Sequence, residues 1–384
     1  MWTDVRRIAA IAFGVLLLVS IGAPGPASAA DTIVATYTVG DFPLGVAVTP
    51  DGAELWAVNN GDDSVSVLSL PSGTPLATIL VGGSPQLVAI TPDGGRAFVS
   101  NYVDNTVSVI DVATHSVIHT IGSINGPVGI VASPDGRYVY VVNEFVGLTR
   151  IQTSAPWSTT NIVFPGGQAE LVALSPDGTL AYVSNSGSSK LEVVNTSTWM
   201  VQEVAVANSP FGVAVSADGA TVAVVRESAG RVDFLQASDL TVVTGSVAVG
   251  SNPKDVVITP DGSKAYVTNY TGNSVSVIDM ATKGVSTTVM PVLSAHLEVL
   301  SPDWSRLYVA DLNHFSVVAI DTGLSKPAST AATTSGGESA PARYALTFQG
   351  NGGTCDTGSA TAISGTWLTI PAVGACSRDG YEFV

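Results

Sequence analysis

The chain has 384 residues, of which 12% are charged, and its formal net charge is −16. Soluble proteins average about 25% charged residues, so this chain is both poor in charge and acidic. This balance excludes nucleic acid as an expected partner, because affinity for the phosphate backbone depends on clustered Lys and Arg.

Residues 1–30 have the layout of a secretory signal peptide. Arg6 and Arg7 precede an apolar run over residues 8–21, and small residues follow at 27–29; this order is typical of a cleaved leader. A membrane anchor is the alternative, but the run is shorter than the roughly 20 residues that span a bilayer. We expect a mature chain that has no membrane span and is secreted, either extracellular or associated with the cell wall.

A turn segment then recurs seven times along the chain, with the sequence Thr/Ser-Pro-Asp-Gly in five copies, SADG in the fifth and SPDW in the seventh. The turns open at Thr49, Thr91, Ser133, Ser175, Ser216, Thr259 and Ser301, so successive copies lie 41 to 43 residues apart. A fixed period of this length indicates a repeat architecture in which each copy is one structural unit.

Each repeat has the pattern of four antiparallel strands. In the first repeat, apolar residues 45–48 lead into the turn, where Pro supplies a φ near −65°, Asp bonds the local backbone and Gly ends the turn. Alternating runs follow at 54–59, 63–70 and 75–83, and such alternation predicts strands. Four-stranded units of about 40 to 45 residues with two apolar faces stack radially as propeller blades.

The sequence therefore predicts an all-β fold, a seven-bladed β-propeller of four-stranded antiparallel blades over residues 31–323. The seventh repeat has strand patterns at 296–300, 306–310 and 315–321, but no fourth strand follows them. Residues 33–40 supply a strand of matching pattern before the first repeat. We expect this N-terminal strand to join the last blade and close the ring.

Four segments carry a family resemblance: FVSN at 98–101, YVVN at 140–143, YVSN at 182–185 and YVTN at 266–269. With the NTVSVID and NSVSVID runs that follow two of them, the repeats resemble the YVTN-family β-propeller repeat of bacterial and archaeal surface proteins. The resemblance implies the propeller fold and an extracellular scaffold, and it implies no single activity. The fifth repeat departs most, with SADG at the turn and AVVR at 223–226.

The C-terminal part is predicted to be a separate unit. Residues 324–343 are rich in Ser, Thr, Ala, Pro and Gly and read as an extended linker. In residues 344–384, the segments TFQGNGGT, LTIPA and RDGYEF resemble the small β-grasp repeat of listerial internalins. Such repeats continue with Gly-Trp, which is missing here, so we expect an incomplete module. Its Cys355 and Cys376 are the only cysteines, and in an exported chain they are expected to pair.

Comparison of the repeats, residue by residue, separates structural positions from candidate functional ones. A residue shared by most repeats is explained by blade geometry, whereas a departure needs a local reason. Five residues before each turn the repeats have Leu44, Gln86, Val128, Glu170, Phe211, Lys254 and His296. This is the most varied position near the expected central channel. Charged departures also occur in repeats five to seven, at Arg226, Asp255, Glu298 and Asp311.

Glu298 is the sharpest departure. Its counterparts in the other repeats are Val46, Val88, Ile130, Val172, Val213 and Val256. A buried carboxylate needs a partner or takes up a proton. Two interpretations remain open: a structural ion pair, with His296 on the same strand face as the nearest candidate, or a polar patch that binds a ligand.

Two functional hypotheses follow. The sequence has no GxSxG, P-loop or HExxH motif, and we expect neither a metal nor a cofactor. The leading hypothesis is a monomeric scaffold at the cell surface or cell wall that binds a protein or glycan partner at the channel mouth. The predicted ligand-binding residues are Glu170, Phe211, Arg226, Lys254, Asp255, His296, Glu298 and Asp311. The alternative is a propeller enzyme, similar to a lactonase, a lyase or a cofactor-dependent dehydrogenase, with its site at the same mouth.

Overall fold

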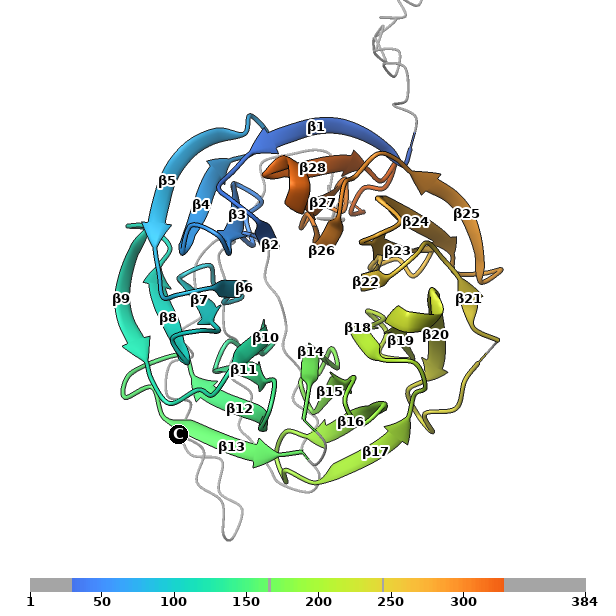
Figure 1. The fold of residues 1–384 in the computed structure, drawn as a ribbon, viewed down its shortest axis with the longest axis horizontal. Helices are drawn as coiled ribbons and strands as arrows, with labels where there is room; N and C mark the ends of the chain where they lie inside the picture. The colour runs from blue at the N-terminus through green and yellow to red at the C-terminus, as the bar shows by residue number, and fades with distance from the viewer. Residues whose placement is uncertain (1–29, 165–166, 244, 328–384) are drawn as a thin grey trace, which may run out of the picture. The chain divides into compact units, whose positions relative to one another are not determined.

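Twenty-eight β-strands dominate residues 30–164, 167–243 and 245–327, the part of the chain that this computed structural model describes. They form seven sheets of four strands each, and every strand pairs antiparallel with its neighbour. The sheets are arranged as blades around a central axis (Figure 1). The predicted all-β, seven-bladed propeller is therefore confirmed.

We number the blades in chain order of their innermost strands. Blades 1 to 3 consist of β2 (Pro43–Val48), β3 (Glu54–Asn59), β4 (Ser64–Ser69), β5 (Thr74–Leu80); β6 (Pro85–Ile90), β7 (Arg96–Asn101), β8 (Thr106–Asp111), β9 (Ser116–Ile121); and β10 (Pro127–Ala132), β11 (Tyr138–Asn143), β12 (Gly147–Gln152), β13 (Thr159–Val163). Blades 4 and 5 consist of β14 (Ala169–Leu174), β15 (Leu180–Asn185), β16 (Lys190–Asn195), β17 (Val201–Ala205); and β18 (Pro210–Val215), β19 (Thr221–Arg226), β20 (Arg231–Gln236), β21 (Val247–Ala248).

Blades 6 and 7 complete the ring. They consist of β22 (Pro253–Ile258), β23 (Lys264–Asn269), β24 (Ser274–Asp279), β25 (Gly284–Val289); and β26 (Ala295–Leu300), β27 (Arg306–Asp311), β28 (Ser316–Asp321), β1 (Thr32–Thr38). Two short 3₁₀ turns, η1 (Glu227–Ala229) and η2 (Leu312–His314), lie in the loops between second and third strands of blades 5 and 7. Blade 5, the most divergent repeat, has an outermost strand of only two residues.

The Thr/Ser-Pro-Asp-Gly turns are closed by their own side chains. In the first turn, the Thr49 hydroxyl donates to Asp51 at 2.6 Å, and Asp51 accepts the Ala53 amide at 3.0 Å. Gly52 has a φ of +76°, which glycine adopts without the steric cost that a Cβ imposes. The seventh turn has Trp304 at this position, with a φ of +67°.

Turns of neighbouring blades also contact each other. A Cβ on Gly94 would lie 3.6 Å from Pro50 of the preceding blade, and the glycines of four other turns have the same relation to a proline. Gly262 has no such neighbour, because the preceding turn has Ala217 in place of proline. The proline of the repeat therefore serves the contact between blades as well as the turn.

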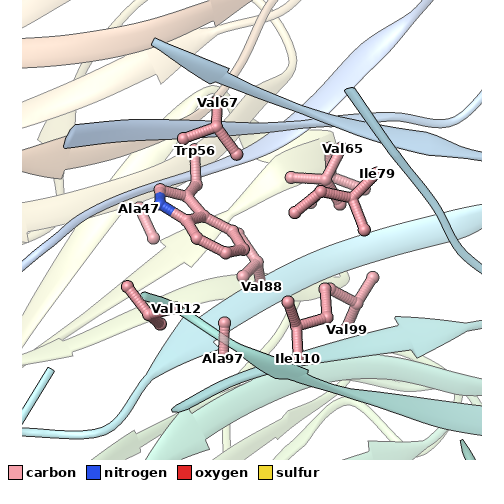
Figure 2. Close-up of a cluster of buried hydrophobic side chains, with 11 residues drawn as sticks. Ala47, Trp56, Val65, Val67, Ile79, Val88, Ala97, Val99, Ile110 and Val112 are labelled. Carbon is pink, nitrogen blue, oxygen red and sulfur yellow. The ribbon is translucent and has the colours of Figure 1, made fainter. Parts of the chain in front are cut away.

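The hydrophobic core lies between the blades. Figure 2 shows the cluster between blades 1 and 2, where Trp56, Val65 and Val67 face Val88 and Ile110. Trp56 has no exposed surface. Burial of each such side chain stabilises the fold by about 1.5–3 kcal/mol, which explains why single blades are not independent units.

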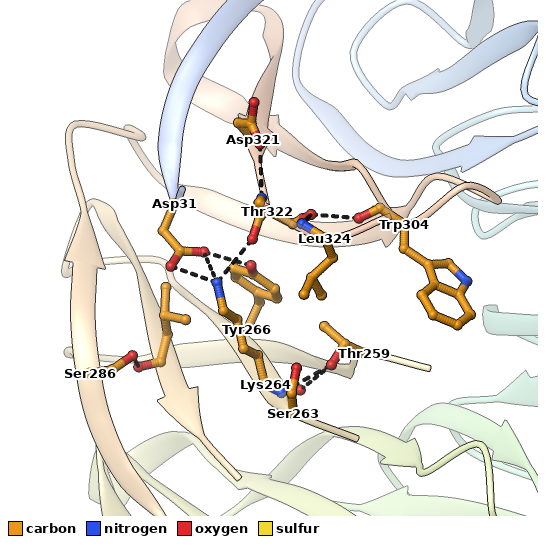
Figure 3. A network of polar contacts seen from close by, with 12 residues as sticks. Asp31, Thr259, Ser263, Lys264, Tyr266, Ser286, Trp304, Asp321, Thr322 and Leu324 are labelled. Atoms are coloured by element: carbon orange, nitrogen blue, oxygen red, sulfur yellow. Dashed lines mark hydrogen bonds and ion pairs between the residues drawn. The ribbon is translucent and has the colours of Figure 1, made fainter. Parts of the chain in front are cut away.

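The N-terminal strand closes the ring as predicted. β1 pairs antiparallel with β28, from Thr32 opposite Asp321 to Thr38 opposite Ser316. Immediately before it, the Asp31 carboxylate accepts hydrogen bonds from Lys264 Nζ at 2.8 Å and from the Tyr266 hydroxyl at 2.6 Å, both on β23 of blade 6 (Figure 3). Asp31 therefore ties the closing strand to the neighbouring blade.

Several predictions concern residues outside the described part of the chain. These are the signal peptide, most of the linker and the C-terminal β-grasp-like module with its Cys355–Cys376 disulfide. Within the described residues, no helix is long and apolar enough to cross a membrane.

Candidate functional site

A β-bulge sets the geometry at the start of each innermost strand. In blade 1, Pro43 pairs with Asn59 and Val46 with Ala57, so three steps on β2 match two on β3. Blades 2 to 7 have a corresponding irregularity. A bulge re-aims the side chains beside it, and here it lies at the variable position singled out from the sequence.

Three of the predicted site residues meet at this end of the channel. The Lys254 ammonium lies 4.2 Å from the centre of the Phe211 ring, within cation–π range. The His296 ring is perpendicular to Phe211, with their centres 6.5 Å apart, and perpendicular to Tyr270 at 6.2 Å. Burial lowers the His296 pKa to about 4, with the Lys254 charge acting in the same direction, so the imidazole is neutral at pH 7.

Lys254 also forms an ion pair. Its Nζ lies 2.5 Å from Glu227 Oε1, and the same carboxylate accepts a hydrogen bond from the Asn252 amide at 3.2 Å. The Lys254 and Glu227 side chains are 15% and 20% exposed. The ammonium is therefore held between an aromatic ring and a carboxylate at the edge of the channel.

A second acidic group lies at the blade 3 and 4 side of the mouth. Glu170 accepts a hydrogen bond from the Ser186 hydroxyl at 2.6 Å. Burial raises the Glu170 pKa, and the charge of Glu144 acts in the same direction. Glu144 itself accepts a hydrogen bond from the Tyr102 hydroxyl at 2.5 Å.

The sequence comparison missed most of this second set of residues. They occupy the position immediately after the last residue of the second strand, which is Asn in five blades, Arg226 in blade 5 and Asp311 in blade 7. At this position the seven blades have Asn60, Tyr102, Glu144, Ser186, Glu227, Tyr270 and Leu312. Five of these residues make the contacts just described. The signal was available, because this position varies as strongly as the one in the innermost strand. We define the channel mouth as Tyr102, Glu144, Glu170, Ser186, Phe211, Glu227, Lys254, Tyr270 and His296.

Apolar side chains fill the channel below the mouth. Leu87, Leu171 and Leu297 belong to one apolar cluster together with Phe211, although they come from blades 2, 4 and 7. Residues of such distant blades meet only across the axis. The middle of the ring in Figure 1 is thus occupied by side chains, and the mouth has an apolar floor.

Neighbouring blades alternate in how they pack around the axis. The third residue of the innermost strand is Gly45, Leu87, Gly129, Leu171, Gly212, Asp255 and Leu297, and the penultimate residue of the second strand is Val58, Ser100, Val142, Ser184, Val225, Thr268 and Ala310. In even blades the hydroxyl bridges to the next blade, as in the 2.8 Å hydrogen bond from Ser100 to the Val128 carbonyl. In odd blades glycine is required, since a Cβ on Gly129 would lie 2.7 Å from the Glu170 carbonyl oxygen. Two kinds of blade cannot alternate without a break around a ring of seven. The break is at blade 7, which is an odd blade but has Leu297 in place of glycine.

Asp255 and Glu298 lie together where blade 6 meets blade 7. The Glu298 amide donates to Asp255 Oδ2 at 3.4 Å, and the Val256 amide donates to Oδ1 at 2.9 Å. Burial raises the Asp255 pKa to about 7, and burial together with the Asp255 charge raises the Glu298 pKa well above its usual range. Asp255 is half-buried, whereas Glu298 is only 9% exposed.

The ion pair with His296, one of the two interpretations of Glu298, does not form. Neither carboxylate oxygen of Glu298 has a hydrogen-bond partner, and His296 packs against Phe211 and Tyr270 instead. The prediction assumed that residues two apart share a strand face. The bulge between Ala295 and Glu298 interrupts that alternation.

Two predicted site residues are held by contacts of their own blades. Arg226 donates to the Ala207 carbonyl at 3.1 Å and forms an ion pair with Asp233 at 3.3 Å, in place of the Asn–Ser hydrogen bonds of other blades. Asp311 accepts the Leu293 amide and lies 3.0 Å from His314 Nδ1. Neither side chain contacts the mouth residues in these interactions, and both stabilise loops.

Possible metal ligands do not form a cluster in the described residues. In residues 30–164, 167–243 and 245–327, no group of three or more His, Cys, Asp or Glu side chains is placed to hold a metal ion. His296, Glu170 and Asp311 make the separate contacts described above.

The fold and the mouth together define the class of protein: a seven-bladed β-propeller with charged and aromatic side chains at one end of an apolar-filled channel. The chain is similar to a solved structure, Kuenenia stuttgartiensis hydrazine synthase, with a TM-score of 0.64 and 21% sequence identity over 75% of this chain and 97% of that chain. At this identity the likeness shows the fold alone. In all, 1717 chains of solved structures match this chain. No protein-family model and no curated protein sequence matches the chain.

Proposed function

We propose that the protein is a secreted scaffold of the cell surface or cell wall that binds a protein or glycan partner through the channel mouth. The observation that carries the proposal is the convergence of polar and aromatic side chains from blades 2 to 7 over an apolar floor. Binding sites are typically largely apolar concave places with a few polar groups that fix orientation. The signal-peptide layout and the resemblance to the YVTN repeat support an extracellular location.

The chemistry of the mouth favours a glycan. Phe211 and Tyr270 are aromatic side chains, which can pack against the apolar side of a sugar, and Glu144 and Glu170 are carboxylates, which accept hydrogen bonds from hydroxyls. Glu170 has a desolvated position and one hydrogen bond, from Ser186, so it retains acceptor capacity. Lys254 adds the single cation of the set. We place the glycan between the Glu170 side of the mouth and Phe211.

A cosedimentation experiment tests the proposal. The full chain is mixed with insoluble cell-wall peptidoglycan, and the bound fraction is compared for wild type, Glu170→Gln and Lys254→Ala. We expect each substitution to lower the affinity at least tenfold, because a lost charged hydrogen bond costs about 1.5–3 kcal/mol. Gln86→Ala is the matched control, since Gln86 occupies the same ring position but bonds its own loop at Ser84.

Two results would count against the mouth as the binding site. If Gln86→Ala weakens binding as much as the other substitutions, the charged side of the mouth has no special role. If only removal of residues 328–384 abolishes binding, the partner is recognised by the C-terminal unit.

A further inference from the structure

The junction of blades 6 and 7 contains two acidic side chains at positions that are apolar in the equivalent junctions. The equivalent pairs are Leu87 with Ile130, Leu171 with Val213, and Asp255 with Glu298. The backbone bridge is the same, because the Thr268 hydroxyl donates to the His296 carbonyl as Ser100 does to Val128. The two equivalent junctions, of blades 2 and 3 and of blades 4 and 5, thus serve as an internal control.

The two carboxylates differ in how they are satisfied. Asp255 is oriented by the backbone amides of Val256 and Glu298. Glu298 is 9% exposed, and neither of its buried carboxylate oxygens has a hydrogen bond of ordinary geometry, although the nearby Val257 amide acts to lower its pKa. A buried carboxylate in this condition is strongly destabilising unless a cation or a proton accompanies it.

Among the described residues, no cationic side chain pairs with either carboxylate. Lys254 is paired with Glu227 and Lys264 with Asp31. None of the ion pairs formed by the described residues includes Asp255 or Glu298. Within the part of the chain that the structure describes, no side chain supplies the compensating charge, so a proton or a bound cation must supply it.

The donor set indicates which cation fits. Carboxylate oxygens suit hard divalent ions, and Mg²⁺ is commonly held by one or two carboxylates with several waters retained. Asp255 is only half-buried, so part of the residue remains open to solvent. We propose that Asp255 and Glu298 bind one hard divalent cation, of the Mg²⁺ or Ca²⁺ class, between blades 6 and 7.

This site is distinct from the binding of a partner at the mouth and does not depend on it. A cation here would join the innermost strands of the two blades that Asp31 joins at the ring's outer edge (Figure 3). Both contacts stabilise the junction that is made when the N-terminal strand closes the ring.

Thermal unfolding with and without cation tests the proposal. The full chain is treated with chelator, desalted and melted alone, with Mg²⁺ and with Ca²⁺. A ligand at a hundredfold excess over its Kd should raise the Tm of a chain this size by roughly 4–10 °C. The double substitution Asp255→Leu with Glu298→Val restores the side chains of the equivalent junctions, so it is expected to fold and to show no response to either ion.

Glu192→Ser is the matched control. Glu192 is another buried carboxylate with an unpartnered oxygen, in blade 4, and its counterparts include Ser66, Ser108 and Ser276. The carboxylate opposite it, Glu203, is on the same blade and is already paired with Lys190, so Glu192→Ser should keep the full response to the ion. Terbium luminescence excited through tyrosine gives a second measurement, since Tyr266 packs at the same junction; the wild type should show it and Glu298→Gln should not.

The proposal is overturned by either of two results. The first is a wild-type Tm that neither Mg²⁺ nor Ca²⁺ changes, together with no terbium signal above that of Glu298→Gln; the pair would then be neutralised by protons. The second is a response of equal size in the double variant, which would locate the ion elsewhere. If the double variant does not fold, equilibrium dialysis decides, with one ion bound per wild-type chain and none per Glu298→Gln chain expected.

Discussion

The contact between Asp31 and blade 6 is predicted to be a major determinant of ring stability. Asp31→Ala removes a carboxylate whose side chain is 12% exposed, and it leaves the Lys264 ammonium and the Tyr266 hydroxyl without their shared acceptor. Burial, with the hydrogen bond to Asp31 in the same direction, raises the Tyr266 pKa far above its usual range. The phenol therefore stays a donor at any pH of interest.

The size of the effect follows from the partners that remain. Breaking a fully buried ion pair costs about 3–5 kcal/mol. Lys264 is 22% exposed and keeps its hydrogen bond to the Thr322 carbonyl at 2.9 Å, so solvent and this carbonyl reduce the loss. We expect Asp31→Ala to lower the free energy of unfolding by about 2 kcal/mol. For a chain of this size the Tm would fall by roughly 4–8 °C.

The assay is urea unfolding of the full chain followed by tryptophan fluorescence. Tyr266→Phe removes one of the hydrogen bonds and should lose about 1 kcal/mol. Glu203→Ala is the control, because its pair with Lys190 is on the surface and its loss should leave the midpoint unchanged. Surface substitutions usually change the free energy of unfolding by no more than about 0.5 kcal/mol. If Asp31→Ala lowers it by less than about this amount, the contact has no role in closing the ring.

Three further predictions concern a turn, the mouth and the cysteines. Ala217→Pro should stabilise the fold by about 0.4–1 kcal/mol, because proline lowers the conformational entropy of the unfolded chain, and it should add the missing contact with Gly262. A lower Tm would mean that this turn cannot accommodate the proline side chain. Burial raises the Glu170 pKa, so the folded wild type binds more protons than the unfolded chain and loses stability as the pH rises above the pKa that Glu170 has in the unfolded chain. Glu170→Gln should therefore have the higher Tm at pH 7, and the difference in Tm should vanish near pH 4. Thiol labelling of oxidatively produced protein should find neither Cys355 nor Cys376 reactive, and two reactive thiols would contradict the disulfide.

The sequence was sufficient for the fold. The local signals were the strand alternation, the turn residues and the spacing of 41 to 43 residues. A four-stranded repeat cannot bury both of its apolar faces by itself, so the repeats are expected to stack radially. The missing fourth strand of the last repeat likewise predicted the pairing of β1 with β28. Comparison of repeats also identified Glu170, Phe211, Lys254 and His296 as mouth residues, because in a ring of equal units a departure stands out.

Only the tertiary structure decided which departures act together. Contacts such as Tyr102 with Glu144 and Lys254 with Glu227 join different blades, and their distances depend on the angle between blades, which no local pattern contains. The bulge at the start of β26 separated His296 from Glu298 and left Glu298 next to Asp255. Arg226 and Asp311 were drawn into their own loops by partners in the same blade or its entry loop. Strand alternation fails wherever a bulge inserts a residue, so the direction of a side chain at the channel mouth is set by three-dimensional packing and not by its place in the repeat.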